Sequence, residues 1–93
     1  MNKGELIDRL YQQTSSTKAQ VREVIDSFID TVQAEVARGG KVQLVNFGTF
    51  EQAHRKATTK RNPQTGQRIR VPAKVVPRFR AGKGFEERVR RGR

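Results

Sequence analysis

No constellation of side chains in this 93-residue sequence supports catalysis or a metal site. The chain has no cysteine, which excludes disulfides, thiolate metal sites and thiol catalysis. His54 is the only histidine, and we interpret it as a surface or strand residue and not as a ligand. Glu86 and Glu87 are adjacent in a predicted helix, so their side chains point apart and form no acid–base pair. We therefore predict no catalytic residues, no metal site, no cofactor and no small-molecule substrate.

Cationic side chains, in contrast, are abundant and unevenly placed. The chain has 20 Lys and Arg against 9 Asp and Glu, a net charge of +11 and a pI near 11.3. Residues 1–40 hold five basic and six acidic side chains, whereas residues 41–93 hold fifteen basic and three acidic ones. Such a charge indicates an extended polyanion as the partner. The C-terminal half is predicted to bind it and the N-terminal half to serve as scaffold.

The densest cationic run covers residues 55–74, with seven basic and no acidic side chains. At its centre stands Asn62-Pro63-Gln64-Thr65-Gly66, an order typical of a tight turn because proline presets φ and asparagine bonds its own backbone. The flanks, residues 57–61 and 67–71, are about equal in length. They predict a two-stranded β-ribbon with a proline at its tip, mobile until a partner clamps it. The matched flanks favour this interpretation over a disordered basic tail.

Two helices are predicted to position this run. Asn2 and Glu5 have the spacing of a capping box, which predicts a helix over about residues 3–13. Thr17 and Gln20 repeat that spacing at the start of a longer helix. Its apolar residues recur every three or four positions, and Gly39-Gly40 ends it. The apolar residues are Leu6, Ile7, Leu10 and Tyr11 in the first helix, and Val21, Val24, Ile25, Phe28, Ile29, Val32 and Val36 in the second.

The apolar stripe of these helices is larger than so small a chain can cover by itself, which favours pairing with a second copy.

From residue 42 the apolar period changes to two, and a turn at 46–48 predicts a β-hairpin. A later strand around residues 75–79 contains Pro77, which predicts a sheet edge or a bulge. A short basic helix over residues 85–91 follows. The phenylalanines predicted to lie in the core are Phe28, Phe47, Phe50 and Phe79.

Four segments, in this order and spacing, resemble the HU/IHF family of bacterial histone-like proteins over essentially the whole chain, and HU more than IHF. They are Met1-Asn2-Lys3-Gly4-Glu5-Leu6, Asn46-Phe47-Gly48-Thr49-Phe50, Arg61-Asn62-Pro63-Gln64-Thr65-Gly66, and Val76-Pro77-Arg78-Phe79 followed by Ala81-Gly82-Lys83. The resemblance implies an α+β fold: an intertwined homodimer with a helical base, a three-stranded antiparallel sheet and extended β-ribbon arms. It implies one domain over residues 1–93, divided as follows: dimerisation base 1–40, sheet 41–54 and 75–81, DNA-binding arm 55–74, and basic C-terminal helix and tail 82–93.

The function that the resemblance implies is binding of double-stranded DNA with little sequence specificity. Two arms would wrap the minor groove, and Pro63 would wedge between base pairs, so that DNA is bent, compacted and stabilised. Bent, nicked or junction DNA would be preferred. The protein would be located in the cytoplasm, in the nucleoid. No secretory signal or membrane span is expected from the sequence. The residues predicted to contact DNA are Lys3, Arg55, Lys56, Lys60, Arg61, Asn62, Pro63, Gln64, Gly66, Arg68, Arg70, Lys74, Arg80 and Lys83.

The sequence departs from the family pattern at three places. Asn46 stands where glycine is usual, and asparagine tolerates the positive φ that the turn needs. Thr58 stands where many members carry arginine, and Arg68 and Arg70 are expected to compensate. The tail at residues 88–93 is more basic than usual and is expected to extend the DNA footprint.

Three further expectations concern partners. If the first helix lies on the second, Lys3 and Asp26 form an ion pair for which DNA competes, as in some family members. One alternative function is a sequence-preferring, heterodimeric subunit of the IHF type. The other is an RNA-binding or ribosome-associated protein, because phosphate contacts alone do not separate RNA from DNA.

Overall fold

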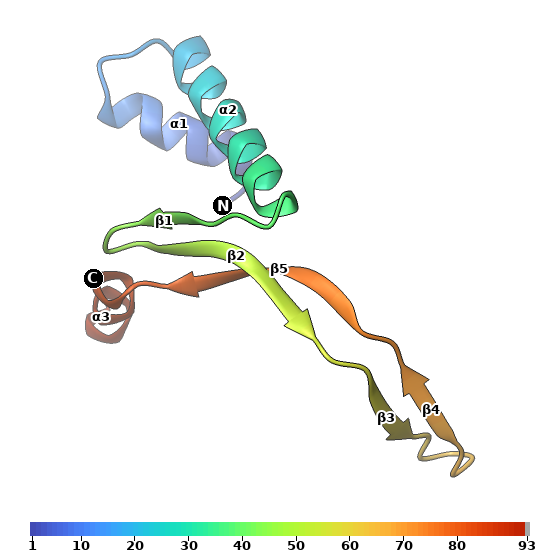
Figure 1. Cartoon of the computed structure of the whole chain (residues 1–93). Coiled ribbons are helices and arrows are strands. Elements are labelled where there is room, and N and C mark those ends of the chain that lie inside the picture. Colours follow the sequence, from blue (N-terminus) through green and yellow to red (C-terminus); the bar gives the residue numbers. More distant parts are fainter. Residues whose placement is uncertain (93) are drawn as a thin grey trace. The chain divides into compact units, whose positions relative to one another are not determined.

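The computed structural model describes residues 1–92, and its elements form two compact units, one of residues 1–34 and one that begins at Glu35. Figure 1 shows the elements in chain order. They are α1 (Lys3–Gln13), α2 (Lys18–Ala37), β1 (Val42–Leu44), β2 (Gly48–Arg55), β3 (Thr58–Arg61), β4 (Arg68–Val71), β5 (Lys74–Ala81) and α3 (Lys83–Arg91).

In the first unit, both predicted helix starts are confirmed by their caps. The Asn2 side chain accepts a hydrogen bond from the Glu5 amide at 2.9 Å, and the Glu5 carboxylate accepts one from the Asn2 amide at 3.4 Å. Thr17 and Gln20 exchange the equivalent pair at 3.1 and 2.9 Å. These bonds satisfy amides that the first turn of a helix leaves without partners.

Within the same unit, two ion pairs join α1 to α2, and α1 contains one fully buried side chain. Ile7 is 2% exposed. Lys3 lies 2.5 Å from Asp26, and Lys18 lies 2.6 Å from Asp8, so each pair joins the two helices. The expected Lys3–Asp26 contact is therefore confirmed.

The apolar stripe of α2 is only partly covered within one chain. Val21 is buried, whereas Val24 and Ile29 are exposed. Phe28 is also 40% exposed, and Phe47 and Phe79 of the second unit are 43% and 39% exposed, so these three predicted core residues are not buried within a single chain. The stripe of α2 that carries Phe28 stays open. The reason is that α1 is 11 residues long against 20 in α2 and cannot shield the whole stripe.

The second unit contains a three-stranded antiparallel sheet in the order β1-β2-β5, as predicted. Asn46 has φ of +64°, which confirms the positive φ expected in the β1–β2 turn. Phe50 stands opposite both Val42 and Phe79 in the two ladders. Pro77 lies in β5, an edge strand, where its missing amide costs no ladder bond.

Four phenylalanine rings form the apolar cluster of this unit. Phe50 and Phe79 have ring centroids 4.8 Å apart, and Phe47 stacks on Phe85 at 5.6 Å. A side chain at Gly48 would collide with the ring of Phe79, which explains why glycine opens β2.

The last helix begins at Lys83, two residues before the predicted start. The Glu86 amide donates to the Gly82 carbonyl at 3.0 Å, so Gly84 lies inside the first turn and does not separate strand from helix. Gly92 ends the helix in the left-handed conformation. Of the predicted basic tail, residues 88–93, the structure describes the part up to Gly92, and Arg93 lies outside the described residues.

A separate two-stranded sheet, β3–β4, forms the predicted ribbon. It continues the long β2–β5 pair toward the tip, as Figure 1 shows. At the tip the Asn62 side chain accepts from the Gln64 amide, and the Gly66 amide donates to the Asn62 carbonyl at 2.8 Å. Gly66 has φ of +73°, a value that glycine adopts without strain. Pro63 therefore sits in a hydrogen-bonded turn at the end of the ribbon.

Candidate nucleic-acid interface

The β3–β4 ribbon has two chemically different faces. Residues paired directly across an antiparallel ladder point to the same side, and successive residues alternate. Thr59 pairs with Arg70 and Arg61 with Arg68, which places three arginines on one face. The other face carries the pairs Thr58–Val71 and Lys60–Ile69, including both apolar side chains of the ribbon. The ribbon thus presents a cationic side and a mixed side.

The cationic side of the ribbon repels itself. Arg61 stands directly opposite Arg68, and like charges in a cross-strand pair are destabilising. No acidic residue occurs between positions 55 and 74 to offset them. The ribbon is also almost wholly exposed, with only Val71 partly covered. A bound polyanion would remove this repulsion.

The three-stranded sheet is sided in the same way. Phe50 and Phe79 form a pair on one face. The next residues along each strand, Glu51 with Arg78 and Thr49 with Arg80, therefore point to the opposite face. Alternation places the last pair of this ladder, Arg55 with Lys74, on that opposite face too.

The cationic faces of sheet and ribbon share one parity. Residues 56–57 separate β2 from β3, and residues 72–73 separate β4 from β5. Both interruptions have an even number of residues, so the ribbon arginines keep the alternate sequence positions of Arg55 and Lys74. We call this set, with Lys41, which contacts Glu51, the cationic track. Its members are Lys41, Arg80, Arg78, Lys74, Arg55, Arg70, Arg68 and Arg61.

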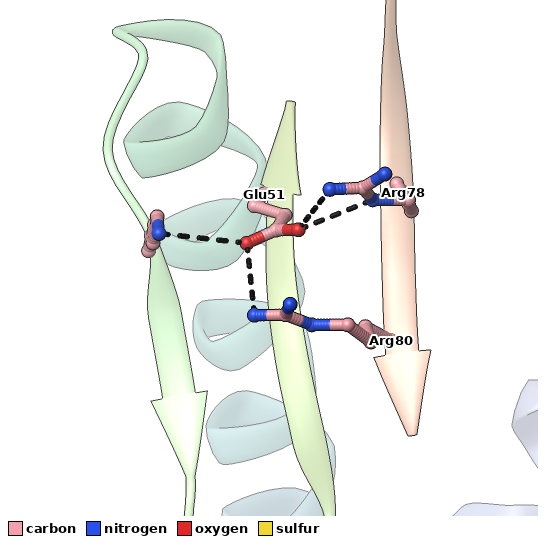
Figure 2. A network of polar contacts seen from close by, with 4 residues as sticks. Glu51, Arg78 and Arg80 are labelled. Carbon is pink, nitrogen blue, oxygen red and sulfur yellow. Dashed lines mark hydrogen bonds and ion pairs between the residues drawn. The ribbon is translucent and has the colours of Figure 1, made fainter. Parts of the chain in front are cut away.

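One carboxylate lies within the track, at its sheet end. Glu51 Oε2 accepts a hydrogen bond from Arg78 Nε at 3.1 Å and also contacts Arg78 Nη2 (Figure 2). Its Oε1 lies 3.5 Å from Arg80 Nη2 and 3.7 Å from Lys41 Nζ. The Arg78 hydrogen bond holds the pKa of Glu51 below its ordinary value. Burial opposes that shift, and the positive charges of Arg80, Arg78 and Lys41 reinforce it.

The structure separates the predicted contact residues into several groups. Arg55, Lys74 and Arg80 lie on the cationic face of the sheet, and Arg61, Arg68 and Arg70 on that of the ribbon. The tip turn contains Asn62, Pro63, Gln64 and Gly66. Lys60 lies on the mixed face of the ribbon, Lys56 lies in the interruption, Lys83 begins α3, and Lys3 lies in the helical unit.

Two cations of the track, Lys41 and Arg78, were missed by sequence reasoning, as was the role of Glu51. Arg78 precedes Arg80 by two positions in a strand, so alternation could have grouped them. The contact of Lys41 with Glu51 joins the residue that precedes β1 to β2, and the sequence pattern alone does not give that register.

Within residues 1–92, no group of three or more His, Cys, Asp or Glu side chains is placed to hold a metal ion. In the same part of the chain, no helix combines the length and apolar character needed to cross a membrane.

A ribbon with arginines on one face and a hydrogen-bonded turn at its tip, continued by a cationic sheet, defines a protein that binds a nucleic-acid backbone. The chain belongs to the family described as Bacterial DNA-binding protein, which matches residues 1–90. The HU/IHF resemblance is thereby confirmed.

Named relatives and solved structures agree with this family. The DNA-binding protein HU of Nostoc sp. is 46% identical over 89 residues, covering 96% of this chain and 95% of that protein. The Anabaena HU-DNA cocrystal structure matches with a TM-score of 0.85 at 46% identity, over 96% of this chain and 97% of that one. HU from Thermotoga maritima matches with a TM-score of 0.69 at 34% identity, over 96% and 98%. The predicted α+β fold, with its sheet and ribbon, is that of these proteins.

Proposed function

We propose that this protein is a histone-like DNA-binding protein of the bacterial nucleoid, which binds duplex DNA as a homodimer with little sequence specificity and bends it. The observation that carries the proposal is the sided ribbon, with Arg61, Arg68 and Arg70 on one face and Pro63 at its tip. The Anabaena relative was crystallised with DNA, which supports the choice of ligand. The protein acts by binding alone, in the cytoplasm.

Binding is driven by the neutralisation of phosphates. Each arginine or lysine that contacts a phosphate releases condensed counterions, so affinity falls steeply with salt. If each subunit of a dimer supplies four or five contacts, affinity falls by about 10³–10⁵-fold between ~50 and ~200 mM salt. Arginine and lysine contacts of this kind position the duplex but do not read its sequence, which explains the low specificity.

Bending requires a local device. Smooth bending of a 20–30 bp site costs on the order of 1–6 kcal/mol, and unstacking a base step costs about a few more. Pro63 suits a wedge between bases because it is rigid and apolar and has no amide donor to leave unsatisfied. The hydrogen bonds of Asn62 and Gly66 fix the turn that holds it. DNA that is already bent, nicked or branched requires less deformation and is therefore preferred.

Dimerisation follows from the apolar surface that one chain leaves open. Val24, Phe28 and Ile29 in the helical unit are exposed in the single chain, as are Val45 and Phe47 in the second unit. A second copy would cover such surfaces, and a twofold axis would supply two arms.

The experiment is a gel-shift titration on linear, nicked and four-way-junction DNA and on double-stranded RNA, at ~50 and ~200 mM salt. We expect binding to junction and nicked DNA above linear DNA, and weaker binding to RNA, whose wide, shallow minor groove fits a ribbon poorly. Equal or tighter binding to RNA would overturn the proposal. Equilibrium sedimentation tests the dimer, and a monomer in the DNA-bound state contradicts it.

A further inference from the structure

The sheet end of the cationic track is built differently from the ribbon. Here the carboxylate of Glu51 is 5% exposed, whereas the side chains of Lys41, Arg78 and Arg80 are 68%, 52% and 64% exposed. The three cations contact the carboxylate from different sides, and Figure 2 shows Arg78 and Arg80 reaching it from the neighbouring strand. A ligand that approaches this face therefore meets positive charge first, and three cations against one ionised carboxylate leave the cluster positive.

The contacts with Glu51 leave hydrogen-bond donors of all three cations available. A guanidinium has five N–H donors, and Arg78 engages Glu51 through its Nε and Nη2 nitrogens. Arg80 reaches Glu51 with Nη2 at 3.5 Å, and lysine has three donors. Each cation can therefore keep its contact with the carboxylate and donate to a phosphate oxygen at the same time. Side chains already held in place lose less conformational freedom on binding than free ones.

We propose that Lys41, Arg78 and Arg80 form a phosphate-binding cluster on the sheet, oriented by Glu51, which takes a backbone phosphate of the duplex gripped by the ribbon. The inference rests on the proposed function and extends it from the arm to the body of the protein. Lys41, Arg78 and Arg80 are binding residues in this scheme, and Glu51 is a positioning residue.

Continuity of charge identifies the ligand as the same duplex. Between this cluster and the ribbon, Arg55 and Lys74 form a pair on the same face of the β2–β5 ladder. At about 3.3–3.4 Å per residue, the four positions from Arg78 to Lys74 span roughly 13 Å. Phosphates of one strand follow one another every ~3.4 Å along the axis of the duplex, so this row of cations faces several of them. A polyphosphate backbone fits such a row, whereas an isolated phosphate ion would engage one part of it.

The first test maps phosphate contacts by ethylation interference on a nicked duplex. The variant is Arg78→Gln with Arg80→Gln. The matched control is Arg22→Gln with Arg38→Gln, which removes the same charge from exposed arginines of the helical segment and its C-terminal end. The reference for the ribbon is Arg61→Gln with Arg68→Gln.

We expect the sheet variant to abolish interference at one set of phosphates and to keep the set that the ribbon variant abolishes. The slope of log affinity against log salt should decrease by about 0.9 for each phosphate that is no longer neutralised. The control should keep both sets. The inference would be overturned if the sheet variant left the interference pattern and the salt slope unchanged. It would also be overturned if the control variant reduced both as much as the sheet variant does.

The second test addresses Glu51. Because Glu51→Gln keeps all three cations but removes the charge that orients them, we expect weaker interference at the sheet set alone, with partial rescue in Glu51→Asp. A merely structural role would instead weaken both sets together and lower the melting temperature in proportion. The triple variant Glu51→Gln, Arg78→Gln, Arg80→Gln leaves no buried charge without partners. It should fold, and it should show no interference at the phosphates that the sheet cluster contacts.

The two proposals fail separately. If the ribbon variant keeps full affinity and bending, the proposed function fails. If the ribbon variant loses them and the sheet variant behaves as the control, only the cluster fails.

Discussion

The helical unit and the β3–β4 ribbon use charge in opposite ways. In the helical unit, Lys3 and Lys18 are each paired with an aspartate on the other helix, and Ile7 is buried. In the ribbon, arginines face one another across the ladder with no acidic residue in the segment. The first arrangement stabilises the folded chain, and the second stores repulsion that a polyanion relieves. Stability and affinity should therefore respond to separate sets of substitutions.

The largest difference between an effect on DNA affinity and an effect on stability is expected from the ribbon arginines. The triple change Arg61→Gln, Arg68→Gln, Arg70→Gln should lower DNA affinity on the order of 10³-fold at about 0.1 M salt, because three arginines of each arm no longer neutralise phosphates. The melting temperature should stay constant or rise slightly, since the cross-strand repulsion disappears. Gel shift and thermal unfolding measure the two effects. A parallel decrease of both would show that the two regions are not separable.

A substitution at Ile7 should have the opposite outcome, lower stability with unchanged DNA binding. Ile7→Ala should lower the free energy of unfolding by about 2–5 kcal/mol, because it leaves a cavity at a side chain that is 2% exposed. Ile7→Val, the matched control, should cost about 0.5–1.5 kcal/mol. Urea unfolding measures both. Where the variants remain folded, the salt dependence of DNA binding should equal that of the original chain, and a changed slope would contradict the comparison.

A finer division is expected within the arm itself. Pro63→Ala removes the wedge and leaves every arginine in place, so affinity for linear DNA should change by only a few-fold while bending decreases. Fluorescence transfer between the ends of a short duplex measures the bend. Equal transfer efficiency with both proteins would rule out the wedge.

Acid should weaken the sheet through Glu51. Because the pKa of Glu51 is lowered from 4.5 in the folded chain, its ionised form stabilises the fold at pH above about 4.5. That contribution disappears as the pH falls through the lower, folded-state value. The stability difference between the original chain and Glu51→Gln, measured by urea unfolding, should therefore shrink as the pH falls below about 4.5. A difference that stays constant from neutral to strongly acidic pH would show that the lowered pKa is not realised.

The smallest effect is expected at the Lys3–Asp26 pair. Both side chains are about half exposed, so the pair contributes about 0–1 kcal/mol to stability. Asp26→Ala should release Lys3 for a phosphate and make the salt dependence of binding slightly steeper. An unchanged slope would remove Lys3 from the interface.

Most of the fold was predictable because local rules decide it. Capping residues set the starts of α1 and α2, and the turn chemistry of residues 62–66 placed the tip of the ribbon. The start of α3 was missed because Gly84 reads as a breaker, although Gly82 caps the helix two residues earlier. The exposure of Phe28 was missed because periodicity shows which face is apolar but not what covers it.

The candidate site was predictable in part. Arg61, Arg68 and Arg70 were expected contacts, but their segregation onto one face depends on the ladder register. The contacts between Glu51, Lys41 and Arg78 depend on two registers at once. Such cross-strand neighbours are far apart along the chain, so no local pattern brings them together.

The paired interruptions at residues 56–57 and 72–73 also constrain how this chain can change length. Inserting one residue into both interruptions would turn the ribbon over relative to the sheet, and the arginines would then follow the alternation of Val75 and His54 instead of that of Arg78. One residue inserted into only one interruption would leave the two strands of the ribbon out of step and would require a bulge. Adding two residues to both would preserve the facing and lengthen the reach by about 7 Å. Drift in arm length among descendants of this chain should therefore proceed in matched, even steps.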